Sequence, residues 1–99
     1  KFGGNPVKDG ESILNDAKLV VSRHKKGDRV VVVTSAMFGV TNQLVDIARK
    51  LVEPAANPDQ QVPDFMKHIS SKHFQACQTA IKDKNTLAQT TRTVKGTLE

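Results

Sequence analysis

The sequence has 99 residues, which suffices for one small domain and is too short for two. With 37% hydrophobic and 25% charged residues, its composition is that of a globular protein and excludes collagen, a coiled coil and gross disorder. The longest apolar run, Val30 to Val33, is far shorter than the roughly 20 residues of a membrane span. A single cysteine, Cys77, excludes an intrachain disulfide, and no signal peptide is visible. We therefore expect a cytoplasmic protein with no membrane partner.

The net charge of +5 is dispersed along the chain. Its densest cluster is Arg23, Lys25, Lys26 and Arg29, and four phenylalanines are the only aromatic residues that could stack on bases. We therefore expect no nucleic-acid partner, although a basic interaction module stays open as an alternative.

The first 28 residues predict a turn followed by a helix. Gly3 and Gly4 permit positive φ angles, and Asn5-Pro6 is typical of a turn. Apolar residues then recur at helical spacing and predict an amphipathic helix over about 10–25. Asp9 or Ser12 can cap its start, and Gly27 can end it.

The segment from Arg29 to Thr34 predicts a β-strand. Four consecutive valines are typical of a strand that is buried on both faces of a parallel sheet. A helix before such a strand implies a βαβ crossover, whose first strand would lie just before residue 3. The expected fold class is therefore α/β.

The second half of the chain predicts three helices and one loop. Apolar spacing predicts a helix over about 41–53, and three of the four prolines then predict a loop over 54–63. Asp64 would cap a third helix that ends near Asn85, and a weaker, threonine-rich helix would follow over about 87–98. Neither the three histidines nor Cys77 has the spacing of a metal site, so no metal ligand is expected in this chain.

Two segments stand where strands of a parallel sheet would end, which is where α/β proteins bind ligands. The first comprises Lys1, Phe2, Gly3 and Gly4. Glycine-rich backbone can direct several N–H groups at a phosphate, and a neighbouring lysine can neutralise the charge of a phosphoryl group in transfer. The alternative is that the two glycines form only a turn.

The second segment runs from Ser35 to Thr41 and carries two hydroxyl groups on either side of Gly39. Ser35 would lie at the end of the strand, and Thr41 at the start of the next helix. Together they could hold a small polar or anionic substrate near the positive end of that helix. The alternative is that Thr41 serves only as the helix N-cap.

The two segments, taken with their spacing, resemble the start of an aspartate kinase. The residues concerned are Lys1-Phe2-Gly3-Gly4-x-x-Val7 and, after a helix, four valines followed by Ser35-Ala36-Met37-x-Gly39-Val40-Thr41-Asn42. The resemblance is strong over residues 1–53 and weaker over 64–81. It implies the amino acid kinase fold, a three-layer αβα sandwich around a mainly parallel sheet, of which residues 1–99 would be an incomplete, helix-rich, amino-terminal part.

The resemblance also implies a reaction and a set of roles. Aspartate kinases use ATP and Mg²⁺ to phosphorylate the β-carboxylate of L-aspartate, at the start of lysine, threonine and methionine biosynthesis. Lys1 would be the catalytic residue, and Lys1, Phe2, Gly3 and Gly4 would bind the phosphates. Ser35 and Thr41 would bind aspartate. The resemblance further implies a homo-oligomer, with Mg²⁺ held mainly by the nucleotide and by residues outside this chain.

Some positions depart from the family pattern. Asn5-Pro6 replaces a Thr-Ser pair, and Phe38 stands where a small residue is common. The string Lys-x-Gly-Gly-Asn is similar to the opening of acetylglutamate kinases, so that activity and an inactive, ligand-binding relative remain alternatives. Because the other half of the kinase site cannot fit in 99 residues, we expect this chain alone to be inactive.

Overall fold

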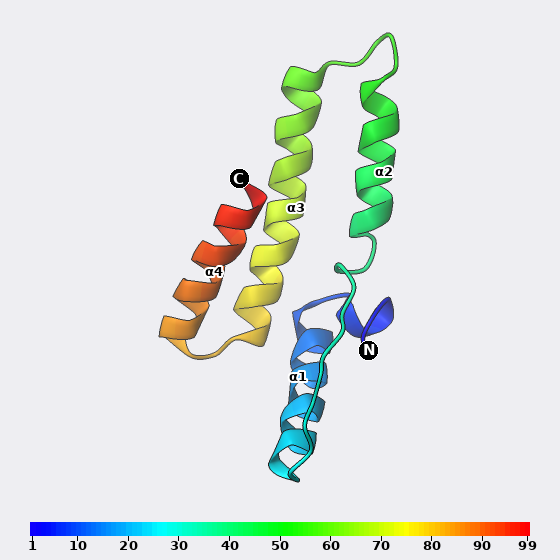
Figure 1. Ribbon diagram of the computed structural model, residues 1–99. Coiled ribbons are helices and arrows are strands. Elements are labelled where there is room, and N and C mark those ends of the chain that lie inside the picture. The colour runs from blue at the N-terminus through cyan, green and yellow to red at the C-terminus, as the bar shows by residue number, and fades with distance from the viewer.

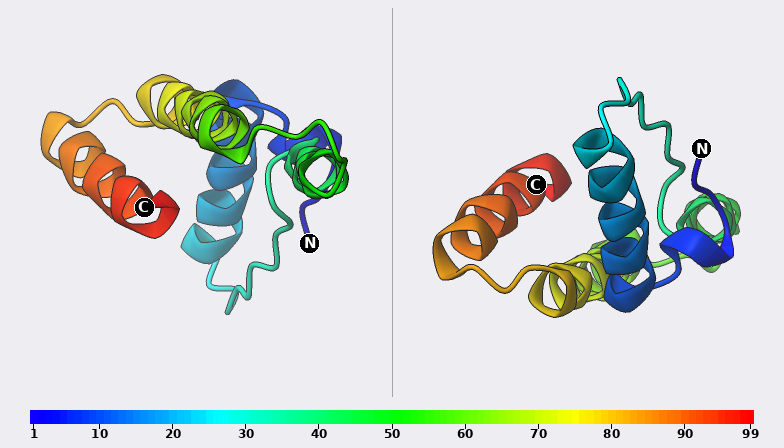
Figure 2. Two further views of the ribbon diagram at one scale, coloured as in Figure 1. Left: turned by 90° about the horizontal axis from the view of Figure 1, so that it is seen from above. Right: turned by 90° about the horizontal axis from the view of Figure 1, so that it is seen from below.

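The computed structural model describes residues 1–99 as four α-helices and one short 3₁₀ helix (Figure 1). The 3₁₀ helix η1 (Asn5–Val7) leads into α1 (Gly10–Lys25), and α2 (Val40–Leu51), α3 (Pro58–Ala80) and α4 (Lys84–Leu98) follow. The long helix α3 packs against each of the other three α-helices. Figure 2 shows α2 and α4 on opposite sides of it.

Helix α1 forms as its sequence predicts. The side chain of Asp9 accepts a hydrogen bond from the backbone N–H of Ser12 at 2.8 Å, which satisfies one of the free N–H groups of the first turn. Basic residues occupy the last turn, where they complement the helix dipole. Gly27 follows with a φ of 94°, which reverses the chain.

The start of α1 lies directly against α3 at Gly10. A Cβ atom at this position would lie 2.6 Å from the backbone oxygen of Ala76 and 2.7 Å from Cβ of Thr79. Gly10 and Ala76 are both buried. The two helix backbones can approach this closely only because residue 10 has no side chain.

The prediction of a loop over 54–63 is wrong for its second half, because α3 already begins at Pro58. Proline is favoured in the first turn of a helix, where no N–H is needed. Asn57 is the N-cap, and its own N–H donates to the Gln61 side chain at 2.7 Å. Pro63 and Asp64 consequently lie inside the helix, and Asp64 is not a cap.

The predicted break at Asn85 is also misplaced. Helix α3 ends at Ala80, and α4 begins at Lys84. Asp83 caps α4 by accepting hydrogen bonds from the backbone N–H of Thr86 at 2.8 Å and from its hydroxyl at 2.7 Å. Asn85 is therefore a residue of the first turn of α4.

The predicted α/β fold is contradicted, since the structure contains no β-strand and no sheet, and hence no αβα sandwich. One isolated parallel bridge joins Phe2 to Thr34. The four valines that were predicted to be buried are exposed: Val30 by 38%, Val31 by 87%, Val32 by 49% and Val33 by 55%. The reason is the absence of neighbouring strands: β-branched residues favour a strand where a ladder and a packed face exist, and Phe2 offers a single point of pairing.

The core is small and lies where η1 and the starts of α1 and α2 meet the middle of α3. Its buried hydrophobic residues are Val7, Val40, Ile69 and Ala76. The radius of gyration is 16.3 Å, against about 13 Å for a compact domain of this length. The helices therefore form an elongated array without a common interior. None of them is both long and apolar enough to cross a membrane.

The close approach of α1 to α3 predicts opposite effects for two glycine substitutions. Gly10→Ala should destabilise the protein by about 1–3 kcal/mol, because its methyl group overlaps Ala76 and Thr79. Gly96→Ala, inside α4 with open space around its Cβ position, should stabilise it by about 0.5–1 kcal/mol. Urea unfolding measures both values. A Gly10→Ala protein as stable as wild type would contradict this packing.

The two aspartate caps predict a loss of stability in acid. Hydrogen bonds from the backbone and side chain of Ser12 lower the pKa of Asp9 below its ordinary value of 3.8. Hydrogen bonds from the side chain and backbone of Thr86 lower the pKa of Asp83 in the same way. The folded state therefore binds these protons less tightly than the unfolded state. This stabilisation is present above pH 3.8 and is lost as the pH falls through the lowered pKa values.

A double substitution isolates this contribution. Asp9→Asn with Asp83→Asn keeps both caps but removes their titration, so thermal unfolding followed by circular dichroism should lose part of its acid sensitivity. Asp46→Asn with Asp64→Asn is the matched control, because neither carboxylate accepts a hydrogen bond. Equal acid sensitivity in the first pair and wild type would refute the assignment.

Candidate functional site

The structure brings the two candidate segments together through backbone hydrogen bonds. The N–H of Phe2 donates to the carbonyl of Val33 at 2.8 Å, and the N–H of Ser35 donates to the carbonyl of Phe2 at 3.0 Å. A third bond runs from the N–H of Phe38 to the carbonyl of Val7, also at 3.0 Å. Residues 1–7 and 33–38 thus form one unit beside the start of α2 (Figure 1).

Gly3 and Ser35 are direct neighbours in this unit. A Cβ atom at Gly3 would lie 3.4 Å from Oγ of Ser35. The Ser35 hydroxyl donates to the carbonyl of Ala36 at 2.7 Å, so its lone pairs remain open to a donor. A residue predicted to bind phosphate and one predicted to bind substrate are therefore adjacent.

The glycine segment presents free backbone donors. Gly4 has φ 73° and ψ −129°, a conformation open only to glycine, and it leads into η1 through the bond from the N–H of Val7 to its carbonyl at 3.0 Å. The N–H groups of Gly3 and Gly4 donate to no backbone carbonyl. Lys1 is exposed and forms no ion pair. One ammonium group and two free N–H groups thus lie within four residues.

Thr41 lies in the first turn of α2, but it is not the cap. The N-cap is Gly39, with φ 84° and no side-chain hydrogen bond. The Thr41 side chain is exposed and takes part in no hydrogen bond. The N–H groups of Thr41 and Asn42 donate to no backbone carbonyl. The helix start therefore combines a free hydroxyl with free N–H groups, the arrangement that favours an anion.

The structure joins Phe2 and Gly3 to Ser35, whereas no hydrogen bond links Thr41 to the glycine segment. The hydrogen bond between Val7 and Phe38 was not predicted from the sequence, although Val7 belongs to the first motif and is only 5% exposed. The sequence did contain a signal for this contact: Val7 is an apolar residue between the Asn5-Pro6 turn and the polar start of the next helix.

A cavity of about 470 Å³ adjoins this unit and lies between α1 and the segment that returns from it. Its walls are mostly apolar, and Phe2 and Ser35 belong to both the cavity and the unit. Asp16 of α1 also lines it, with one carboxylate oxygen buried and without a hydrogen-bond partner. No group of three or more metal-ligating side chains occurs in the chain.

Comparison with known proteins confirms the resemblance. The chain is 42% identical over 66 residues to an aspartokinase of Bacillus sp. (strain MGA3), covering 67% of this chain and 15% of that protein. It is 47% identical over 58 residues to an aspartokinase of Mycolicibacterium smegmatis, covering 59% and 14%. With an aspartate kinase of Pseudomonas putida it shares 43% identity over 71 residues, covering 72% and 16%. The chain thus spans about one seventh of the length of these relatives. No protein-family model matches it.

The conformation of Gly4 predicts a stereochemical test. Because φ is positive and the space around the Cβ position is open, Gly4→Ala should cost about 1–3 kcal/mol through backbone strain alone. A chemically synthesised chain with D-alanine at position 4 should be at least as stable as wild type, because D-residues favour positive φ. Urea unfolding compares the three proteins. Equal loss with either isomer would contradict this geometry.

Proposed function

We propose that this chain contributes the phosphate-binding segment and part of the substrate site of an aspartate kinase. One observation carries the proposal: Gly3 lies against Ser35, beside Lys1 and free backbone N–H groups. The identity of 42–47% with proteins named aspartokinase or aspartate kinase supports the choice of reaction.

Lys1 and the glycine segment would hold the transferred phosphoryl group. The ammonium group of Lys1 would neutralise charge on the γ-phosphate, and the N–H groups of Gly3 and Gly4 would donate to its oxygens. Phe2 would position them, because both its N–H and its carbonyl are bonded to the facing segment. Phosphoryl transfer depends mainly on such positioning and neutralisation.

Ser35 and the start of α2 would hold aspartate. The Ser35 hydroxyl lies beside the phosphate segment, where the carboxylate that attacks phosphorus must be. The free N–H groups and hydroxyl of the first α2 turn suit the other charged groups of an amino acid. Gly39 permits the tight turn between the two places.

In the proposed reaction, an oxygen of the aspartate β-carboxylate bonds to the γ-phosphorus of ATP while the bond from that phosphorus to the β,γ-bridging oxygen breaks. The products are 4-phospho-L-aspartate and ADP, which retains the electron pair. Mg²⁺ supplies charge neutralisation on the nucleotide phosphates. As the resemblance to aspartate kinases implies, the ion would be held mainly by the nucleotide and by residues outside residues 1–99.

We further propose that the parent enzyme is cytoplasmic and homo-oligomeric and feeds lysine, threonine and methionine biosynthesis. These statements rest on the aspartokinase relatives alone.

The test uses the open reading frame that contains this chain. Its product should form ADP only when aspartate is present, and hydroxylamine should trap the acyl phosphate. Lys1→Met should lower kcat about 10²–10³-fold, the usual cost of losing one transition-state donor. Lys8→Met is the matched control: Lys8 is also exposed but follows η1, and its loss should leave kcat within about twofold.

The outcomes separate the alternatives. Phosphorylation of N-acetylglutamate in place of aspartate would identify the product as an acetylglutamate kinase. Aspartate binding without turnover would identify an inactive relative. Aspartate-dependent turnover by residues 1–99 alone would overturn the view that the chain supplies only part of the site.

A further inference from the structure

The loop between Ser35 and α2 is held at both of its ends. The N–H of Ser35 donates to the carbonyl of Phe2 at 3.0 Å, which fixes one end to the glycine segment. Val40, the first residue of α2, is only 7% exposed and belongs to the small core, which fixes the other end. Residues 36–39 therefore bridge the distance between the glycine segment and the core.

One hydrogen bond from the first segment fixes the middle of this loop. The N–H of Phe38 donates to the carbonyl of Val7 at 3.0 Å. Val7 is the last residue of η1 and is 5% exposed, so its carbonyl cannot move without a shift of the core. The contact uses the backbone of Phe38, whose side chain is 54% exposed. The path of the chain from Ser35 to α2 thus depends on Val7.

This path sets the separation of the two places that would hold the ends of the substrate. In the proposed function, Ser35 receives the carboxylate that attacks phosphorus. The first turn of α2, which contains Thr41, receives the other charged groups of the amino acid. Both places lie on the same short loop, so the conformation of that loop fixes the length of substrate that can reach from one to the other.

On the basis of that function, we infer that Val7 is a positioning residue through which the site selects aspartate over glutamate. Glutamate has the same charged groups as aspartate, with one more methylene between them. A loop held in one conformation cannot place the longer molecule correctly at Ser35 and at α2 together. Sites that measure one methylene discriminate by about 10–200-fold. Without its bond to Val7, the loop can adapt to the longer substrate.

The phosphate end of the site does not depend on this bond. Phe2 is tied to the facing segment by two bonds of its own, one to the carbonyl of Val33 and one from the N–H of Ser35. Gly3 contacts Ser35 beside these bonds. Loss of the Phe38 N–H should therefore affect the amino acid substrate and leave the KM for ATP within about twofold of its wild-type value.

The experiment removes only the hydrogen-bond donor. In the product of the complete reading frame, suppression of a stop codon at position 38 with the α-hydroxy acid that corresponds to phenylalanine replaces the N–H with an ester oxygen and keeps the ring. ADP formation gives kcat/KM for aspartate and for glutamate. The ratio of the two should fall about three- to tenfold, which is what one such hydrogen bond contributes.

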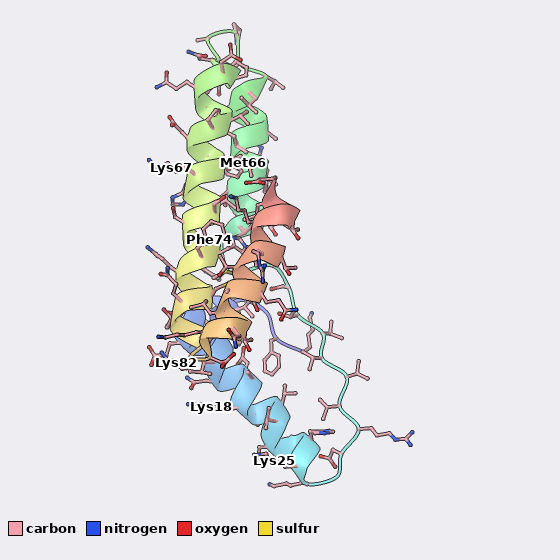
Figure 3. All side chains as sticks on the ribbon, turned by 90° about the vertical axis from the view of Figure 1, so that its left-hand side faces the viewer. Lys18, Lys25, Met66, Lys67, Phe74 and Lys82 are labelled. Carbon is pink, nitrogen blue, oxygen red and sulfur yellow. The ribbon has the colours of Figure 1, made fainter.

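The same ester at Phe74 is the matched control. Phe74 lies inside α3 (Figure 3), where its N–H donates within the helix, and no hydrogen bond links its backbone to residues 1–7 or 33–38. The control also loses one backbone donor, but its ratio should not change. As a second variant, Val7→Ala should lower the ratio in the same direction, whereas Val7→Ile, which again fills the buried space, should retain the wild-type ratio.

The outcomes separate this inference from the function on which it rests. An unchanged ratio in the Phe38 ester, or an equal loss of activity toward aspartate and glutamate, would overturn the role of Val7 and leave the proposed function intact. An equal fall in the ratio with the Phe74 ester would also overturn it, because general destabilisation would then explain the effect. A wild-type product that forms no ADP in response to aspartate would overturn both.

Discussion

The contact between α1 and α3 at Gly10 is the constraint on which the other elements depend. Because residue 10 has no side chain, α1 meets the backbone of α3 at Ala76, and this crossing anchors the amino-terminal third of the chain on the longest helix. The return segment then runs the full length of α1 and brings Ser35 back to Phe2. The candidate site is therefore a result of helix packing, although its own contacts are hydrogen bonds between backbone groups.

The helices were largely predictable because their signals are local. The signals of α1 act within a few positions of one another: the cap Asp9, the basic residues of the last turn, and Gly27 after the helix. The bounds of α1 therefore agree with the prediction. Proline was less informative. Pro58 and Pro63 suggested a loop, but Pro58 fits the first turn of α3, after the N-cap Asn57, whose N–H donates to the Gln61 side chain. Pro63 lies inside the same helix.

The absence of a sheet could not be predicted in the same way, because a strand forms only where it has partners. The valines have strong β-propensity, but a ladder needs a neighbouring strand, and residues 1–99 supply only an isolated bridge to Phe2. Both motifs were expected at the ends of strands of one sheet; no sheet forms, but the backbone hydrogen bonds of Phe2 bring the two motifs together. The alternative that Thr41 serves only as the N-cap is wrong, because Gly39, in a left-handed conformation, is the N-cap of α2.

The bridge between Phe2 and Thr34 also bears on how the site forms during folding. Phe2 precedes α1 in the sequence and Thr34 follows it, so closing the bridge costs the loop entropy of all the chain between them. Each helix, in contrast, forms from contacts a few residues apart. Helix formation takes about a microsecond or less, and the long-range bridge must wait for α1 to dock. We therefore expect the geometry of the candidate site to be among the last features to form and among the first to be lost when the chain opens locally.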